Sequence, residues 1–311
     1  MAGSRRASNR GEGQRVKIVL TGSSGRIGRA IFGALAGDHD VVGIDRHVFS
    51  TTRIVGDCTD PEVLKPALDG ADAVIHTAGP HAPHVGIVSD AEFERVNIDG
   101  TLRLAALARE AGVRRCVYTS TTALYGHAIE PGRCMWIDEA TIPRPRSIYH
   151  RTKLAGEHAL EEAASPDMPV RVIRMSRCFP EPAPAMALYR LHRGVDARDV
   201  GSAHALALTN EGGPFERYVV SGETPFARED CEALSRDAAG VIRERAPALA
   251  RAFDQRGWAL PGRIDRIYSP AKAQAELSWQ PRWGWQEVLA QLDRQSIEVL
   301  PAGAIYDRRS E

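Results

Sequence analysis

Short runs rich in Val and Ile alternate, from Val16 onward, with longer segments in which apolar residues recur every three or four positions. This alternation predicts a parallel sheet covered by helices on both faces. Ligands bind such sheets beyond the carboxyl ends of the strands, so the residues that end each strand are the candidate site. The expected strands are Val16–Leu20, Val41–Ile44, Arg53–Val55, Ala73–Thr77, Arg115–Thr119, Val170–Met175 and Tyr218–Ser221, and the clearest expected helices are Arg26–Leu35, Phe93–Ala111 and Ile148–Ala164.

The charge balance and the hydropathy pattern argue against several classes of protein. The 311 residues carry 40 basic and 40 acidic side chains, which disfavours a nucleic-acid partner. No apolar run approaches the roughly 18 residues of a membrane helix. Residues 1–15 are rich in Arg, Ser and Gly, lack the apolar region of a secretory signal, and are expected to be a disordered leader.

The cysteines are odd in number and are scattered without a C-x-x-C pair. Such usage is typical of reduced thiols in a cytoplasmic protein rather than of a disulfide framework or a zinc site. They are Cys58, Cys116, Cys134, Cys178 and Cys231.

A glycine-rich segment, Thr21-Gly22-Ser23-Ser24-Gly25-Arg26-Ile27-Gly28, lies between the first expected strand and the first expected helix. Glycines permit a tight turn and a close approach of the backbone, and a helix N-terminus presents free N–H groups to a pyrophosphate. A plain glycine-rich turn is the alternative. The context favours a dinucleotide site, because Asp45 ends the second strand 20 residues beyond Gly25.

Two carboxylates bear on the choice of dinucleotide. Asp45 is placed to accept hydrogen bonds from ribose hydroxyls and to repel a 2′-phosphate, which favours NAD over NADP. Arg46 acts in the opposite sense, because its guanidinium could pair with that phosphate. Asp57, which ends the third strand, is placed either to meet the adenine edge or to cap a helix.

Tyr149 and Lys153 are four residues apart in an expected helix, so both side chains lie on one face. A tyrosine with an ordinary pKa of about 10 carries protons poorly at neutral pH, and a neighbouring ammonium group favours its phenolate. Tyr149 is therefore a candidate acid/base for hydride transfer at a hydroxyl group. Tyr268 and Lys272 have the same spacing, but Pro270 lies between them and we assign this pair to structure.

The fifth expected strand ends in a run of hydroxyl residues, Thr119-Ser120-Thr121-Thr122. Hydroxyls at this edge of the sheet could orient a substrate carbonyl or alcohol near Tyr149. An ordinary turn closed by Ser or Thr side chains is the alternative interpretation.

Several motifs occur in a defined order along the chain. They are Gly22/Gly25/Gly28, Asp45, His76-Thr77-Ala78-Gly79, Val96-Asn97-x-x-Gly100-Thr101, Thr119-Ser120-Thr121, Tyr125-Gly126, Tyr149-x-x-x-Lys153 and Arg174, with fainter likeness in Val195-Asp196-Ala197-Arg198-Asp199-Val200 and Glu276-Leu277-Ser278-Trp279-Gln280-Pro281. In combination they resemble the extended short-chain dehydrogenase/reductases, specifically the NAD-dependent epimerase/dehydratase group.

The resemblance implies a fold and a domain layout. The fold is an α/β, Rossmann-type doubly wound parallel sheet with a small C-terminal substrate-binding cap. The layout is an NAD(P)-binding domain over residues 16–178, to which 195–222 return, and a substrate-binding part formed by 179–194 and 223–311. It also implies a homodimer, paired through Phe93–Ala111 and Ile148–Ala164, with a monomer as the alternative.

The resemblance also implies roles for individual residues. Thr121 is the expected catalytic Ser/Thr, Tyr149 the acid/base and Lys153 its partner. Arg46 is added to the expected NAD contacts because of its place beside Asp45. The full expected cofactor set is Gly22, Ser24, Gly25, Arg26, Ile27, Asp45, Arg46, Asp57, Cys58, Thr77, Ala78, Gly79, Asn97, Thr119, Tyr149 and Lys153.

Two departures from the nucleotide-sugar enzymes of this family favour a smaller substrate. Arg177 takes the position of an Asn that helps to hold the nucleotide, and Phe179-Pro180-Glu181-Pro182 replaces a Gly-Pro turn. Only about 20 residues then precede Arg198, where family members often carry a longer substrate-binding insertion.

The remaining candidates lie near the expected substrate. Contacts are expected from His81, Thr121, Thr122 and Arg177. His76, His81 and His84 lack a carboxylate or thiol spaced with them as a ligand set, so no metal site is expected. Basic side chains that could grip a carboxylate or phosphate, or form a solvated basic surface, are Arg177, Arg190, His192 and Arg193. A packed C-terminal cluster is expected of Trp279, Trp283 and Trp285.

We therefore expect an NAD-dependent oxidoreductase or epimerase that oxidises a secondary hydroxyl of a small, sugar-like molecule. Net oxidation and epimerisation share this step. Dehydration is least favoured, because Thr122 and Ala123 occupy the positions where an acidic pair would serve. A non-sugar alcohol or ketone dehydrogenase, or a non-catalytic NAD(P)-binding sensor protein, is the alternative.

Overall fold

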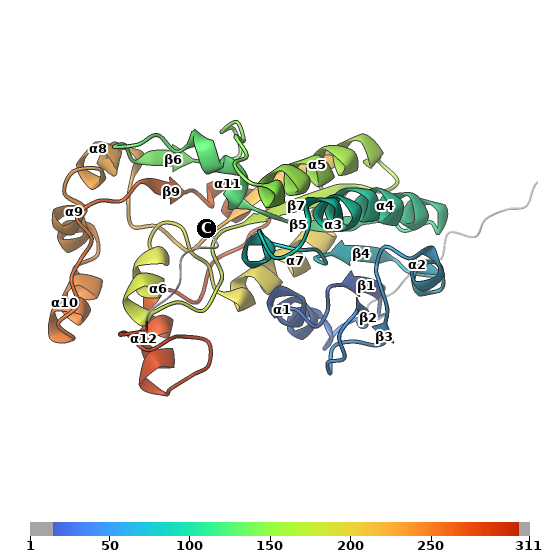
Figure 1. The fold of residues 1–311 in the computed structure, drawn as a ribbon, viewed down its shortest axis with the longest axis horizontal. Helices are drawn as coiled ribbons and strands as arrows, with labels where there is room; N and C mark the ends of the chain where they lie inside the picture. The colour runs from blue at the N-terminus through green and yellow to red at the C-terminus, as the bar shows by residue number, and fades with distance from the viewer. Residues whose placement is uncertain (1–14, 305–311) are drawn as a thin grey trace, which may run out of the picture.

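The structure is a computed structural model that describes residues 15–304 (Figure 1). Seven parallel strands form one sheet in the order β3-β2-β1-β4-β5-β7-β8. The strands are β1 (Lys17–Thr21), β2 (Asp40–Asp45), β3 (Ile54–Val55), β4 (Ala73–His76), β5 (Cys116–Thr121), β7 (Val170–Met175) and β8 (Phe215–Val220). This confirms the predicted doubly wound α/β fold. The expected leader, apart from Arg15, lies outside the described residues.

Helices cover both faces of the sheet because each strand alternates its side chains between two apolar layers. Ile18 and Leu20 of β1 pack on one face, under α1 (Arg26–Leu35) and α7 (Ala197–Thr209). Val19 points to the other face. That face is covered by α2 (Pro61–Leu68), α4 (Gly100–Glu110) and α5 (Ile148–Ala163).

The helix expected over Phe93–Ala111 is interrupted. The chain forms α3 (Asp90–Glu94), then a π-helical turn, η2 (Arg95–Asp99), and then α4. Turns of this type insert an extra residue into a helix and occur mostly at functional sites. The π-turn contains Asn97, whose side chain it buries against the loop after β4.

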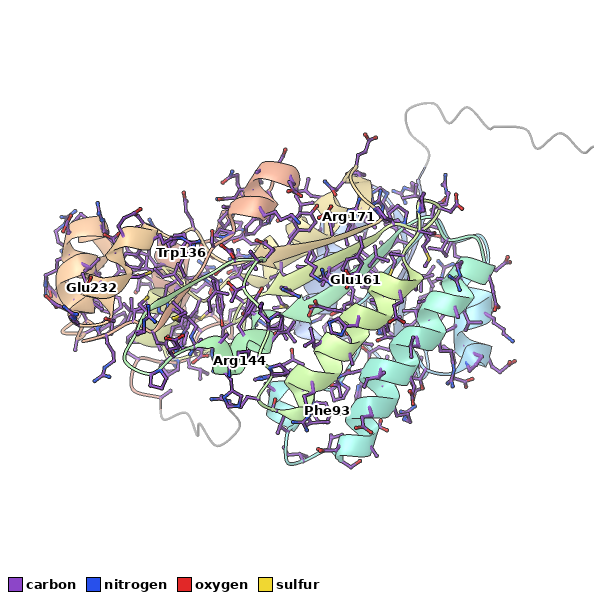
Figure 2. All side chains as sticks on the ribbon, turned by 90° about the horizontal axis from the view of Figure 1, so that it is seen from above. Phe93, Trp136, Arg144, Glu161, Arg171 and Glu232 are labelled. Atoms are coloured by element: carbon purple, nitrogen blue, oxygen red, sulfur yellow. The ribbon has the colours of Figure 1, made fainter. Side chains whose placement is uncertain are left out.

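A second apolar cluster lies at the other end of the molecule from the helices over the sheet. In Figure 2, Trp136 and Glu232 mark this part, and Phe93 and Glu161 mark the helical layer over the sheet. Its helices are α6 (Ala183–Tyr189), α8 (Cys231–Leu234), α9 (Ala238–Arg245), α10 (Pro247–Gln255) and α12 (Trp285–Asp293). The proposed division of the chain into a cofactor part and a substrate part stays a prediction.

One feature of this second part was not expected from the sequence, a short parallel pair that joins β6 (Met135–Ile137) to β9 (Arg266–Tyr268). After β9 the chain forms α11 (Ala271–Glu276), where the sequence predicts a helix over Ala271–Leu277. Three prolines within Phe179–Pro184 predict an irregular segment. The segment is irregular only to Pro182, and α6 begins at Ala183, because proline is tolerated in the first turn of a helix.

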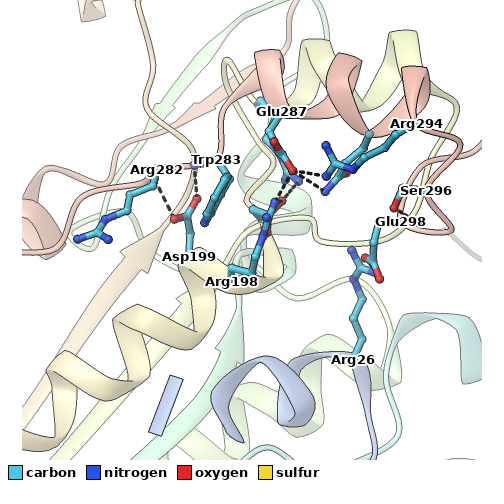
Figure 3. Close-up of polar contacts among 12 residues, drawn as sticks. Arg26, Arg198, Asp199, Arg282, Trp283, Glu287, Arg294, Ser296 and Glu298 are labelled. Atoms are coloured by element: carbon cyan, nitrogen blue, oxygen red, sulfur yellow. Dashed lines mark hydrogen bonds and ion pairs between the residues drawn. The ribbon is translucent and has the colours of Figure 1, made fainter. Parts of the chain in front are cut away.

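The three C-terminal tryptophans do not form one cluster, contrary to expectation. Trp279 is buried in the core between α1, α7 and the sheet. Trp285 packs in the second cluster. Trp283 lies under the Arg198 guanidinium, 3.7 Å from ring centroid to Cζ, and its amide donates to Asp199 (Figure 3). The tryptophans therefore join separate parts of the molecule.

The last described residues return to the sheet. Glu298 forms an ion pair with Arg26 at the start of α1 (Figure 3). Two residues later, the Leu300 amide donates to the Glu181 carbonyl at 3.0 Å, and the Ala183 amide donates to the Leu300 carbonyl at 3.1 Å. Residues 298–300 thus connect the glycine-rich turn with the segment after β7.

None of the helices within residues 15–304 is long and apolar enough to cross a membrane. All five cysteines are free thiols.

Candidate functional site

A cavity of about 720 Å³ lies at the carboxyl ends of the parallel strands. Its walls come from the turns after β1, β2, β4, β5 and β7, from the start of α5, and from β9. Every predicted catalytic, cofactor and substrate residue lines it, apart from Asn97. The structure therefore brings together, in one cavity, residues that span positions 22 to 177 of the sequence.

The glycine-rich turn leaves room for a diphosphate close to the backbone. Gly22 has a φ of +74°, which favours glycine, and its amide donates to the Ile44 carbonyl at 2.8 Å. A Cβ atom at Gly28 would lie 2.0 Å from the Gly22 oxygen. Helix α1 begins next to this turn, and no side chain caps it. Its first N–H groups are therefore available to an anion.

Asp45 lies at the end of β2 as predicted. Burial disfavours its charged form, but hydrogen bonds from the amides of His47 at 2.9 Å and Ser24 at 3.1 Å outweigh this and lower its pKa. The side chain is thus a carboxylate at neutral pH. Arg46 is 3.6 Å from Glu92, so a carboxylate already neutralises part of the charge that could attract a 2′-phosphate.

Asp57 is engaged within its own turn and by a neighbouring helix. It accepts hydrogen bonds from the Thr59 amide at 2.8 Å and from Arg95 at 3.0 Å, and these lower its pKa against the effect of burial. Asp60, not Asp57, caps α2. Burial raises the pKa of the adjacent Cys58 thiol to about 12, so this thiol is unreactive.

The hydroxyl residues that end β5 point alternately to opposite faces of the sheet. Ser120 donates to Glu157 of α5 at 2.5 Å. On the other face, Thr119 lies 2.7 Å from Nε2 of His204 in α7. Because His204 Nδ1 donates to the Val200 carbonyl at 2.8 Å, Nε2 must accept the Thr119 hydrogen. Thr121, the last strand residue, accepts a hydrogen bond from the Ala123 amide at 3.1 Å.

Tyr149 lies in the first turn of α5 and forms a hydrogen bond with the Thr121 side chain. Burial raises the pKa of Tyr149 to about 12, and the hydrogen bond only partly offsets this. The sequence had led us to expect a lowered pKa from the neighbouring ammonium group. The burial of both groups explains the difference, because it disfavours each charge.

Lys153 lies one turn further along α5 and is almost fully buried. Its ammonium nitrogen is 3.8 Å from the centroid of the Tyr118 ring, a favourable cation–π arrangement. Burial lowers the pKa of Lys153 to about 7, against the opposing attraction of Glu157. Lys272 of the second motif differs, since it is half-buried and pairs with Glu216 at 2.7 Å.

Asn97 does not line the cavity but lies behind one of its walls. Its side-chain amide donates to the Pro80 carbonyl at 3.1 Å and to Thr152 at 3.0 Å. A Cβ atom at Gly79 would lie 2.2 Å from Asn97 Oδ1. Asn97 therefore positions the loop after β4, which includes His81.

The far end of the cavity is lined by residues from the second part of the chain. Phe179 stacks on His81, with ring centroids 5.9 Å apart and planes at 8°. The Tyr268 hydroxyl donates to the Thr122 carbonyl at 3.3 Å. Arg193 and Arg266 lie in the same wall. Tyr268, which we had assigned to structure alone, therefore belongs to the cavity.

Two basic residues depart from the expected solvated surface. Arg190 is buried and pairs with Asp196 at 3.2 Å. His192 is buried, and its Nδ1 donates to the Arg266 carbonyl at 2.9 Å. Burial of each is offset by one polar partner, although the Nε of Arg190 has no hydrogen-bond acceptor. Within the described part of the chain, no three His, Cys, Asp or Glu side chains are grouped as metal ligands would be.

A sequence profile of the NAD dependent epimerase/dehydratase family matches residues 18–185, more than half of the chain. The chain belongs to this family. NAD is the cofactor that the family's description names.

Individual relatives in the family cover the chain less completely. NAD-dependent glucose-6-phosphate dehydrogenase of Haloferax volcanii is 32% identical over 162 residues, which are 45% of this chain and 60% of that protein. L-arabinose 1-dehydrogenase (NAD(P)(+)) of the same organism is 33% identical over 151 residues, 45% of this chain and 58% of that protein. The chain thus spans about three fifths of the length of these curated relatives.

The fold extends over most of a solved family structure. UDP-glucose 4-epimerase of Thermus thermophilus, in complex with NAD, superposes with a TM-score of 0.63 and is 25% identical. The superposition covers 88% of this chain and 96% of that chain.

Among the cavity-lining residues that the sequence analysis did not assign to the site are Phe179, Arg266 and Tyr268. Arg266 and Tyr268 lie on β9, which is three residues long and too short for a recognisable alternation. Arg193 carried a usable signal, because it lies only 16 positions after Arg177 in the region expected to cap the site.

Proposed function

We propose that this chain is an NAD-dependent oxidoreductase or epimerase that oxidises a secondary hydroxyl of a sugar or sugar-like substrate. The observation that carries the proposal is the grouping of Thr121, Tyr149 and Lys153 in the same cavity as an uncapped glycine-rich turn. The relatives whose names describe sugar dehydrogenases and sugar epimerases support the substrate class.

The dinucleotide would be held mainly by backbone groups. Gly22 and Gly28 leave space for a diphosphate, and the first N–H groups of α1 would bind it. The Asp45 carboxylate would accept hydrogen bonds from ribose hydroxyls, which supports NAD over NADP. When bound, NAD supplies the acceptor for the hydride.

Three side chains would handle the substrate hydroxyl. Thr121 and Tyr149 share a hydrogen bond and together would orient the substrate oxygen. Tyr149 would accept the hydroxyl proton, for which its raised pKa must first fall. Positive charge beside the phenol lowers that pKa, and Lys153 is the buried cationic group one turn further along α5. Dehydration remains disfavoured, because Thr122 and Ala123 offer no acid/base pair.

The test is a turnover screen with a matched phenol control. The protein is incubated with NAD and panels of free sugars, sugar acids, sugar phosphates, nucleotide sugars and simple alcohols, while NADH absorbance and product composition are followed. NADH formation identifies a dehydrogenase, and product change without net NADH identifies an epimerase. Tyr149→Phe should lose about 10²- to 10⁴-fold in turnover. Tyr218→Phe, which removes a phenol outside the cavity, should retain activity.

Three outcomes would contradict parts of the proposal. Turnover of Tyr149→Phe equal to that of the parent would remove the acid/base role. NAD binding without conversion of any compound in the panels would favour a non-catalytic sensor. Recovery of NADP from the purified protein, measured by mass spectrometry, would overturn the argument from Asp45.

A further inference from the structure

The substrate end of the cavity is strongly basic. Three arginines line it, Arg177 after β7, Arg193 after α6, and Arg266 on β9. Among the cavity-lining residues that the structure describes, the carboxylates are Asp45, Asp57 and Glu92, all in or beside the turns after β2 and β3. The basic end therefore has no acidic lining residue within that set.

The three guanidinium groups are not equally neutralised. Arg177 forms an ion pair with Glu181, and Arg266 pairs with Asp265 at 2.6 Å. The direct ion pair with Asp265 belongs to Arg266, and Arg193 only lowers the pKa of that carboxyl through its charge. The Nε of Arg193 is buried without a hydrogen-bond acceptor. A buried donor without a partner is costly, so the hydrogen-bonding capacity of Arg193, which lines the cavity, is not fully used by the protein itself.

The backbone holds Arg193 beside Arg177. The Arg177 amide donates to the Arg193 carbonyl at 3.1 Å, and the Val195 amide donates to the Arg177 carbonyl at 3.0 Å. Both guanidinium groups also lie over the ring of Tyr189, with Cζ at 4.1 Å from its centroid for Arg193 and 5.8 Å for Arg177. The ring and the backbone thus fix two planar cations next to each other before any ligand binds.

We propose that Arg193, with Arg177 beside it, forms an anion subsite for a carboxylate or phosphate group that the sugar-like substrate itself carries. Planar guanidinium groups match the geometry of both anions. Arg177 and Arg266 already form direct ion pairs with carboxylates, so the cavity offers its charge mainly through Arg193, which favours a single anionic group over a diphosphate. The short connection from Arg177 to Arg198, about 20 residues, also leaves little chain to enclose a nucleotide. This subsite rests on the proposed function, because it assigns the substrate class for the same cavity.

Inorganic phosphate is the first probe, since it tests the anion without assuming the sugar. Binding is measured by calorimetry on the Tyr149→Phe protein with saturating NAD, so that the glycine-rich turn is filled and no turnover occurs. We expect Arg193→Gln to weaken phosphate binding by about 10-fold or more, as expected for loss of a charged hydrogen bond. Arg263→Gln removes an exposed arginine outside the cavity and should change nothing.

Matched sugars then define the source of the anion. D-glucose 6-phosphate and D-glucuronate should each compete with phosphate at least about 10-fold better than D-glucose, and Arg193→Lys should retain part of this difference. Equal competition by charged and neutral sugars would overturn the subsite. Binding of a nucleotide sugar that is tighter than that of the sugar phosphate and insensitive to Arg193→Gln would also overturn it.

The subsite and the proposed function can fail separately. Phosphate binding that depends on Arg193, without conversion of any sugar by the parent protein, would sink the proposed function and leave the subsite. If the protein converts neutral sugars and Arg193→Gln binds phosphate as the parent does, the subsite is wrong and the proposed function stands. A melting temperature and an NAD affinity equal to those of the parent would show that Arg193→Gln is folded. If Arg193→Gln does not fold, Arg193→Lys replaces it in the same phosphate titration.

Discussion

The two ends of the cavity are built in different ways. The end with the glycine-rich turn consists of backbone turns that directly follow neighbouring strands, so the sheet itself fixes their geometry. The basic end consists of side chains from the segment after β7, from the end of α6 and from β9. Substitutions at the first end therefore disturb the fold, whereas those at the second can change the ligand and leave the sheet intact.

The largest effect that we expect concerns pH and Tyr149, which lies between the two ends. In the proposed mechanism, oxidation needs the Tyr149 phenolate as base, whereas carbonyl reduction needs the phenol as donor. With a pKa raised to about 12, the phenolate fraction rises about tenfold per pH unit below that value. The oxidation rate should therefore climb from pH 6 to pH 9, and the reduction rate should not. Initial rates in both directions measure this, and an identical slope in Tyr149→Phe would contradict it.

A substitution in the glycine-rich turn should weaken NAD binding at its own end of the cavity and leave the basic end unchanged. Gly28→Ala places a Cβ atom 2.0 Å from the Gly22 oxygen, so the turn must shift. Overpacking of this kind costs about 1–3 kcal/mol, and the same cost in binding would weaken NAD affinity roughly 5- to 150-fold. Fluorescence titration with NADH measures it.

Gly33→Ala in the same helix is the control for that experiment, since nothing lies within 4 Å of a Cβ atom there. It should leave NADH affinity unchanged. If Gly28→Ala binds NADH as the parent does, the turn is not where the diphosphate binds, and the distinction between the two ends fails.

The burial of Lys153 predicts a pH-dependent cost in stability. Its folded pKa of about 7 lies below the unfolded value of 10.5, so the unfolded chain binds more protons between these values, and this group destabilises the fold most below pH 7. At about 1.4 kcal/mol per pKa unit, the two units between pH 7 and pH 9 mean that Lys153→Met should gain ~3 kcal/mol more over the parent at pH 6 than at pH 9. Urea unfolding at both pH values measures the difference.

Lys272→Met is the matched control for that measurement. Lys272 forms a partly exposed ion pair with Glu216. Its stability change should be small and nearly independent of pH between 6 and 9. A larger gain at pH 9 than at pH 6 for Lys153→Met would reverse the expected sign.

The smallest effect should come from Glu298, which pairs with Arg26 beside the glycine-rich turn. Glu298→Gln leaves Arg26 without that partner and free to attract a diphosphate. NADH affinity should rise by about two- to fivefold, the range expected for one surface ion pair. The control is Glu232→Gln in α8, far from the glycine-rich turn, which breaks an exposed ion pair with Arg236 and should have no effect on NADH affinity. Weaker NADH binding in Glu298→Gln would mean that this carboxylate supports the cofactor end.

The predictability of the two ends also differs, for physical reasons. Gly22, Asp45 and Thr121 could be placed from the sequence because each follows or ends a strand with a clear apolar pattern, and the parallel sheet then gathers the strand ends. The parallel sheet and the helices over it followed from the same alternation. Local sequence patterns were therefore sufficient to predict the site residues whose positions are defined by the strand ends alone.

The remaining side chains are positioned by tertiary contacts, which local sequence patterns do not show. Arg190 is buried because Asp196 pairs with it, and no local pattern distinguishes such an arginine from an exposed one. Tyr268 enters the cavity because its short strand pairs with β6, more than a hundred residues earlier in the chain. The direction of the Tyr149 pKa shift could not be predicted either, because it is set by burial, which the sequence does not show.

Residues 298–300 have a thermodynamic consequence. They contact Arg26 at one end of the cavity and, through Glu181 and Ala183, the segment that carries Arg177 at the other. A ligand that moved this segment at one end would change the affinity of the other end, and reciprocity would require the same factor in both directions.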